Sequence, residues 1–257
     1  MQTIILAGGL GSRLSEESGS KPKPMVEIGG YPILWHIMKT YSSYGFNDFI
    51  ICLGYKGYVI KEYFNNYFLH TANVKISLKN GFDIKYFDSK AEPWTISLVD
   101  TGLEAQTGGR LQRVSHLIKG ETFLFTYGDG LSDINVCDLL KFHKKMNKEI
   151  TVTAVKPPGR FGSLKIRNSV VTNFIEKPDG DGSFINGGFF VANKNFLSRI
   201  TDSQTILENE PLQSAANEGQ LSAFVHRGFW RPMDTLRDKN HLEEMWTNGK
   251  APWRVWR

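Results

Sequence analysis

A chain of 257 residues is long enough for one large α/β domain with its own buried core. With 40% hydrophobic and 22% charged residues, its composition is globular, which excludes a disordered chain. The formal net charge of +5 suits an anionic partner. No zinc-finger, basic-zipper or RNA-recognition signature is present in the sequence, so we expect a small polyanionic ligand and no nucleic acid partner.

The cysteines and the apolar segments of the chain indicate its cellular compartment. Cys52 and Cys137 belong to no Cys-x-x-Cys pair or Cys/His cluster, so we expect free thiols rather than a zinc or redox site. No apolar segment approaches the length of a membrane span, and no basic stretch precedes the short apolar run near Met1. We therefore expect a cytoplasmic protein with no membrane partner.

The first half of the chain alternates strand-like and helix-like segments. An apolar run at 3–7 ends in glycines, and Pro32 opens a helical stretch over 33–44 that Gly45 closes. Further segments continue the alternation: strands at 49–53, 96–99, 122–127 and 150–155, and helices at 57–68, 110–118 and 136–146. This alternation predicts βαβ units around a parallel sheet.

The pattern changes after Pro157-Pro158-Gly159. Segments 164–166 and 170–175 flank the turn-prone Asn168-Ser169 and predict a hairpin. Two more strands and a last helix are expected, at 184–191, 221–226 and 235–246. The mixture predicts one mixed-sheet domain with a C-terminal extension.

The sharpest motif is LAGGLGSRL at 6–14, directly after the first predicted strand. Glycines there let backbone N–H groups approach a phosphate or base, because no Cβ stands in the way. The motif is neither GxGxxG nor a P-loop, and the glycines alone fit an ordinary turn equally well. Arg13 and the KPKPM segment at 21–25 favour a phosphate site, because its prolines stiffen the backbone that carries Lys21 and Lys23.

This combination resembles the sugar nucleotidyltransferases and, among them, the glucose-1-phosphate cytidylyltransferases. The matching segments run in order almost from end to end: GGLGSR at 8–13, KPKPMVEIGG at 21–30, FLFTYGDG at 123–130, PPGRFGSL at 157–164, EKP at 176–178, INGGFF at 185–190 and GFWRPMDTLRD at 228–238. One mild departure is Ser12, where many relatives have Thr. Both residues carry a hydroxyl, so little is put in doubt.

The resemblance implies a Rossmann-like nucleotidyltransferase fold. A mixed, mostly parallel sheet would be flanked by helices, with a small β-rich sugar-binding portion and a C-terminal helical extension. Within the single domain 1–257, residues 1–156 would mainly bind nucleotide, 157–230 would mainly bind sugar, and 231–257 would form a C-terminal helix and tail.

The resemblance also implies an activity. CMP would pass from CTP to α-D-glucose 1-phosphate with Mg²⁺, giving CDP-glucose and pyrophosphate. CDP-glucose implies a role early in making 3,6-dideoxyhexoses for surface polysaccharide such as O-antigen. The family is oligomeric and commonly hexameric, which implies a homo-oligomer.

Two carboxylates are the predicted metal ligands. Asp129 lies between glycines just beyond the strand 122–127, at the edge where open parallel sheets bind ligands. An isolated Gly-Asp-Gly also makes an ordinary turn. Asp234 precedes the helix 235–246, where a lone Asp is more often an N-cap, and the resemblance carries it over as the partner of Asp129. Mg²⁺ takes only one or two carboxylates, so the two roles need not exclude each other.

Lys23 is assigned to the α-phosphate and the sugar phosphate, and Arg13 to the β- and γ-phosphates, which a planar guanidinium can bind bidentately. Solvated surface charge is the ordinary alternative for both. Together with Asp129 they form the predicted catalytic set. The predicted nucleotide-binding set is Leu6, Ala7, Gly8, Gly9, Leu10, Gly11, Ser12, Arg13, Lys23, Thr107, Gly109, Arg110 and Gly128. The predicted sugar-binding set is Tyr127, Gly162, Glu176, Lys177, Asn186 and Gly187.

The chemistry requires no Ser, Cys or His nucleophile, because the attacking phosphate oxygen is already anionic. Catalysis is then mostly positioning and electrostatics. Selecting cytosine requires acceptors for its amino group, and the residues alone do not reveal them. Two alternatives stay open: a related enzyme that uses UTP, dTTP or GTP, and a non-catalytic nucleotide-sugar sensor, which the presence of Arg13, Lys23 and Asp129 disfavours.

Overall fold

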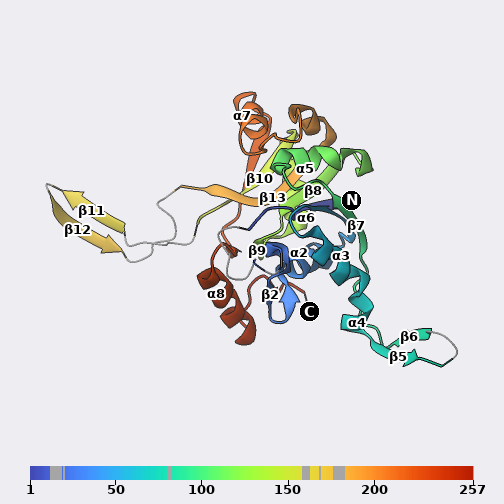
Figure 1. Cartoon of the computed structure of the whole chain (residues 1–257). Helices are drawn as coiled ribbons and strands as arrows, with labels where there is room; N and C mark the ends of the chain where they lie inside the picture. Colours follow the sequence, from blue (N-terminus) through green and yellow to red (C-terminus); the bar gives the residue numbers. More distant parts are fainter. Residues whose placement is uncertain are drawn as a thin grey trace.

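The computed structural model describes residues 1–11, 19, 21–79, 83–157, 163–167, 169–175 and 183–256. Its main strands are β1 (Gln2–Leu6), β4 (Asp48–Leu53), β7 (Thr95–Asp100), β8 (Thr122–Tyr127), β10 (Ile150–Val155), β13 (Ile185–Asn193) and β14 (Leu221–Val225). They form a seven-stranded sheet in the order β14-β10-β13-β8-β1-β4-β7 (Figure 1). β13 pairs antiparallel with β8 and β10, and the other pairs are parallel. The predicted mixed, mostly parallel sheet is confirmed.

Helices cover both faces of this sheet. The first face carries α2 (Ile33–Ser43), α3 (Gly57–Asn65), α6 (Val136–Met146) and α8 (Leu236–Thr247), and the second carries α5 (Thr107–Arg113), η4 (Lys194–Arg199) and α7 (Glu210–Asn217). Side chains alternate across a strand, so Ile5 of β1 packs in the core on the first face, while Ile4 and Leu6 pack on the second. Burial on both faces is the reason that apolar residues follow one another at the end of β1.

Short strand pairs and helices complete the described elements. The pairs are β2 (Glu27–Ile28) with β3 (Tyr31–Pro32), β5 (Asn73–Ser77) with β6 (Asp83–Phe87), β9 (Gly130–Ser132) with β15 (Trp230–Pro232), and β11 (Ser163–Arg167) with β12 (Val170–Ile175). The short helices are η2 (Lys23–Met25), α4 (Tyr67–Thr71) and η3 (Ser115–Leu117). In Figure 1 the hairpins β5–β6 and β11–β12 extend away from the body. The sequence predicts the second hairpin, but neither the first nor α7.

The structure bears on the cysteines and on the helices of the chain. Cys52 and Cys137 are free thiols, as predicted. Within the described ranges, no helix combines the length and the apolar character needed to cross a bilayer.

The C-terminal tail is anchored in an aromatic cluster around His36. Trp253 has no exposed surface, and its indole Nε1 donates to His36 Nδ1 at 3.4 Å. His36 Nε2 lies 2.8 Å from the carbonyl oxygen of Ile28 and donates to it, because Nδ1 is already the acceptor. The ring of Trp246 packs edge-on against the imidazole. The neutral imidazole therefore uses both nitrogens, and burial lowers the pKa of His36 to about 4.

Acid should destabilise the fold through His36. Its pKa falls from an ordinary 6.5 to about 4 on folding, so between these pH values the unfolded chain binds an extra proton. Stability present above pH 6.5 is therefore lost as the pH falls, by up to about 3 kcal/mol. Thermal melts should show Tm falling between pH 6.5 and 4. His36→Gln should have a shallower slope, and equal slopes in wild type and variant would contradict the assignment.

Candidate active site

A cavity of about 500 Å³ opens at the edge of the sheet where the parallel strands β1 and β8 end. The predicted site residues on its wall are Leu6, Ala7, Gly8, Gly9, Gly11, Lys23, Thr107, Arg110, Tyr127, Gly128, Asp129 and Asp234. The described residues Leu10, Gly109, Asn186 and Gly187 are not part of the wall. Predictions for Ser12, Arg13, Gly162, Glu176 and Lys177 lie outside the described residues.

One ammonium group lies between two carboxylates on the cavity wall. Lys23 Nζ donates to Asp129 Oδ2 at 2.7 Å and to Asp234 Oδ1 at 2.8 Å. The Lys23 side chain is only 12% exposed, which excludes the alternative of a solvated surface charge. Burial alone would lower the pKa of Lys23, but the charge of Asp129 and the bonds to both carboxylates outweigh it and raise the pKa above its ordinary value. The three side chains therefore form a single charged cluster.

Separate local structures bring this cluster together. Lys23 begins η2, in which a proline at the start of the helix fixes the backbone. Asp129 follows β8 after one residue, Gly128, at the carboxyl end of a parallel strand. Asp234 follows β15, which pairs with β9, and Met233 N donates to Asp129 O at 2.9 Å. The β9–β15 ladder thus places Asp234 beside Asp129.

The structure excludes the N-cap role for Asp234. The N-cap of α8 is Thr235, and Thr235 and Asp238 form a reciprocal capping box. Asp238 N donates to Thr235 Oγ1 at 3.2 Å, and Thr235 N donates to Asp238 Oδ2 at 3.1 Å. Because this pair caps the helix, the Asp234 carboxylate is not required for capping and bonds to Lys23.

The two carboxylates fit a Mg²⁺ ion by the chemistry of their donor atoms. Asp129 and Asp234 direct hard oxygen ligands toward one shared cation, the ammonium of Lys23. No group of three or more His, Cys, Asp or Glu side chains is arranged to hold a metal in the described part of the chain. Two carboxylates are enough for Mg²⁺ when phosphate oxygens and water complete its coordination.

Arg110 supports the glycine turn after β1. Its guanidinium donates to oxygens of Gly8, Leu53, Thr101 and Gly102 at 2.8–3.1 Å, and the residue is 5% exposed. A Cβ on Gly8 would lie 2.1 Å from this guanidinium, so only glycine fits there. Burial lowers the pKa of Arg110 from its ordinary value. These bonds position the turn, and the predicted contact with a nucleotide stays a prediction.

The glycines that begin α5 serve close packing. A Cβ on Gly108 would lie 2.7 Å from the carbonyl oxygen of Thr205, and one on Gly109 would lie 2.1 Å from that of Ser203. Gly109 N donates to Thr205 O at 3.2 Å, so this amide already has a partner. The glycines bring α5 against the segment 203–205, and the predicted nucleotide contact of Gly109 stays a prediction.

A second group of residues surrounds Tyr127. Asn186 Nδ2 donates to Tyr127 Oη at 3.0 Å, and Trp230 Nε1 donates to Gly187 O at 2.7 Å. Asn186 and Gly187 therefore lie beside the cavity, although they do not line it. The sequence analysis missed several residues of the wall: Trp230, Pro232, Pro24, Ala105 and Gln106. For Trp230 the available signal was its place in the GFWRPMD segment that contains Asp234.

The sheet order and the cavity at its carboxyl edge define the nucleotidyltransferase fold. The solved structure of the inositol-1-phosphate CTP transferase from T. maritima is similar to this chain with a TM-score of 0.63. The likeness covers 100% of this chain and 98% of that one at 17% sequence identity, and it establishes the fold alone.

Sequence comparisons establish the family. The Nucleotidyl transferase family model matches residues 2–238, and the chain belongs to that family. A glucose-1-phosphate cytidylyltransferase of Salmonella typhimurium is 57% identical, with 100% of each chain covered. The mannose-1-phosphate guanylyltransferase catalytic subunit beta of Dictyostelium discoideum is 31% identical over 95% of this chain and 64% of its own length.

Removing the Arg110 guanidinium should loosen the wall of the cavity. Arg110→Met leaves several buried oxygens without their donor, which should cost about 3 kcal/mol and lower Tm by roughly 10 °C. Arg113→Met is the matched control, because Arg113 is exposed on the same helix and should melt like the wild type. Similar thermal melts of the two variants would show that Arg110 does not support the turn.

Proposed function

We propose that the protein is a glucose-1-phosphate cytidylyltransferase, which transfers CMP from CTP to α-D-glucose 1-phosphate and releases pyrophosphate. The observation that carries the reaction class is the Lys23–Asp129–Asp234 cluster on the wall of the cavity. The choice of CTP and glucose 1-phosphate follows the relative from Salmonella typhimurium, which matches over its full length.

The residues of the site suit an in-line displacement. A phosphate oxygen of glucose 1-phosphate forms a bond to the α-phosphorus of CTP, and the bond from that phosphorus to the bridging oxygen breaks as pyrophosphate leaves. No side chain has to take or give a proton. The main obstacle is repulsion between two anionic groups, so fixed positive charge and alignment lower the barrier.

Lys23 supplies that fixed charge in a place that water screens weakly. Its raised pKa keeps the ammonium protonated at neutral pH, and its bonds to Asp129 and Asp234 hold it in position. We assign Asp129 and Asp234 as the ligands of Mg²⁺, which when bound would neutralise charge on the phosphates. Lys23 also orients both carboxylates, because it bonds to one oxygen of each.

The nucleotide would lie along the turn after β1. No atom of the described residues lies within 4 Å of a Cβ built on Gly9, so a ligand can approach the backbone there. Arg13 for the β- and γ-phosphates, and Glu176 and Lys177 for the glucose, are assigned by resemblance alone. The same resemblance suggests supply of CDP-glucose to 3,6-dideoxyhexose synthesis. The cytoplasmic location expected from the sequence stays part of the proposal.

We also propose that the protein is a homo-oligomer, as the resemblance implies. Support comes from the β5–β6 hairpin, where large apolar side chains reach solvent. Ile76 is 48% exposed, Leu78 is 80% exposed and Phe87 is 50% exposed. A partner subunit that covers these side chains would remove apolar surface from water.

Turnover of four nucleotides tests the substrate assignment. Wild-type protein would be assayed with glucose 1-phosphate, Mg²⁺ and one of CTP, UTP, dTTP or GTP, and pyrophosphate release would be measured. We expect kcat/KM for CTP to exceed the others by about 10²-fold, since recognition of a base edge by hydrogen bonds discriminates strongly. Preference for another nucleotide would overturn this assignment. Binding without turnover would favour the sensor.

Lys23→Ala tests the charged cluster. Losing a preorganised cation that acts on the transition state should lower kcat by roughly 10²- to 10³-fold, with smaller effects on substrate binding. Without Mg²⁺ the variant should also melt below the wild type, because Asp129 and Asp234 would then repel each other, and added Mg²⁺ should recover part of the lost Tm.

Lys21→Ala is the matched control for this experiment. Lys21 lies in the same loop but bonds to Glu27, which is 53% exposed, and not to the cluster. We expect kcat and Tm close to those of the wild type. A larger loss of kcat in Lys21→Ala than in Lys23→Ala would move the catalytic role to Lys21.

A further inference from the structure

One carboxylate behind the cavity wall joins the hydroxyl groups of two residues that line the cavity. Glu208 lies between η4 and α7 and is not part of the wall. Its Oε2 accepts from the Thr107 hydroxyl at 2.6 Å, and its Oε1 accepts from the Tyr127 hydroxyl. Thr107 begins α5 and Tyr127 ends β8, so Glu208 ties together two elements of the cavity wall.

These bonds fix the direction of both hydroxyl protons. A hydroxyl has one proton to donate and two lone pairs that accept. The Thr107 hydroxyl gives its proton to Glu208 and accepts from Leu207 N at 2.9 Å. The Tyr127 hydroxyl gives its proton to Glu208 and accepts from Asn186 Nδ2 at 3.0 Å. Each oxygen keeps one lone pair, so each can only accept from a ligand.

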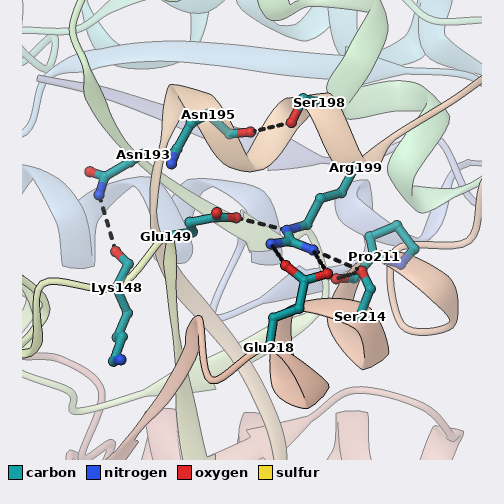
Figure 2. Close-up of polar contacts among 9 residues, drawn as sticks. All are labelled: Lys148, Glu149, Asn193, Asn195, Ser198, Arg199, Pro211, Ser214 and Glu218. Carbon is teal, nitrogen blue, oxygen red and sulfur yellow. Dashed lines mark hydrogen bonds and ion pairs between the residues drawn. The ribbon is translucent and has the colours of Figure 1, made fainter.

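The segment that carries Glu208 is fixed from two directions. Toward α5, Leu207 N donates to Thr107 Oγ1. Away from the cavity, Figure 2 shows the Arg199 guanidinium between Glu149 and Glu218, to which it donates at 2.7 Å and 2.6 Å. These bonds connect the end of η4 with the residue before β10 and the residue after α7. Glu208, between η4 and α7, is thereby placed on a rigid support.

We propose that Glu208 is a positioning residue of this site, which presents the hydroxyl oxygens of Thr107 and Tyr127 to the substrates as hydrogen-bond acceptors. The inference rests on the proposed function. Thr107 belongs to the set predicted to bind the nucleotide, and an exocyclic amino group of its base can donate to Thr107 Oγ1, whereas a keto oxygen in its place would face a lone pair. On the side assigned to the sugar, Tyr127 Oη can accept from a glucose hydroxyl.

Glu208→Gln is the sharpest test, because it keeps the shape of the side chain but changes its hydrogen bonding. An amide has one acceptor and one donor end, so it can no longer accept from both hydroxyls. One of the two hydroxyl groups must then direct its proton away from the side chain at position 208. We expect a lower ratio of kcat/KM for CTP over UTP, a higher KM for glucose 1-phosphate, or both. Each change should be about five- to tenfold, while kcat for CTP should fall less.

Glu210→Gln is the matched control, since Glu210 is exposed two residues away at the start of α7. It removes the same charge and should leave the nucleotide ratio and both KM values unchanged.

Two single variants test the proposal if Glu208→Gln does not fold. Thr107→Val should lower the CTP-to-UTP ratio, and Tyr127→Phe should raise KM for glucose 1-phosphate and leave that for CTP unchanged.

The outcomes separate this inference from the proposed function. Wild-type protein that prefers another nucleotide overturns the proposed function, and the comparison of Glu208→Gln with Glu210→Gln is then made with that nucleotide. A Glu208→Gln variant with the ratio and KM values of the control overturns the inference. So does a variant whose activity falls only in proportion to its folded fraction, with the nucleotide ratio and KM unchanged, because that result indicates a purely structural role.

Discussion

Two ionised carboxylates that lie close together in a half-buried site repel each other unless a cation lies between them. Asp129 and Asp234 meet this condition through the ammonium of Lys23, which bonds to both. At short range and with little water between them, two unneutralised carboxylates would repel each other strongly. The β9–β15 ladder brings the two carboxylates together before α8, and the charge of one lysine offsets their repulsion there.

Around this cluster, two arginine side chains hold backbone segments and helix ends in place through hydrogen bonds. The Arg110 guanidinium donates to the carbonyl oxygens of Gly8, in the glycine turn, and of Gly102. The Arg199 guanidinium donates to the carboxylates of Glu149 and Glu218, which lie beside β10 and α7. Fixed donors and acceptors cost little reorganisation when charge develops during a reaction. A site that works by alignment needs such supports more than it needs a reactive side chain.

Sequence reasoning succeeded where the signal is local. The strands β1, β4 and β8 contain apolar runs, β10 is rich in β-branched residues, and α2 and α6 show helical periodicity, so their type and order could be predicted. The hairpin β5–β6 was missed although Val74 and Ile76 alternate with polar residues ahead of Asn80-Gly81, a typical turn sequence. For α7, the signal that was overlooked is Pro211 in its first turn.

The roles of single polar residues were harder to predict, because their partners are distant in the sequence. The sequence left an N-cap role for Asp234 open, since Asp234 and Thr235 are both good caps and only the contact with Asp238 decides between them. Glu208 carries no motif, and its partners Thr107 and Tyr127 are 101 and 81 positions away. Arg110 was recognised as important, but its many bonds to backbone oxygens could not be foreseen.

The separation of the clustered residues also governs when the site can exist. Lys23 is 106 positions from Asp129 and 211 from Asp234, and Trp253 of the tail contacts His36 across 217 positions. During synthesis on the ribosome, the strands of the first half can begin to pair long before residue 234 emerges. The charged cluster forms only after that, and loop closure over such distances is slow. A nascent or truncated chain that ends before residue 234 therefore has no assembled site, however many of its strands have paired.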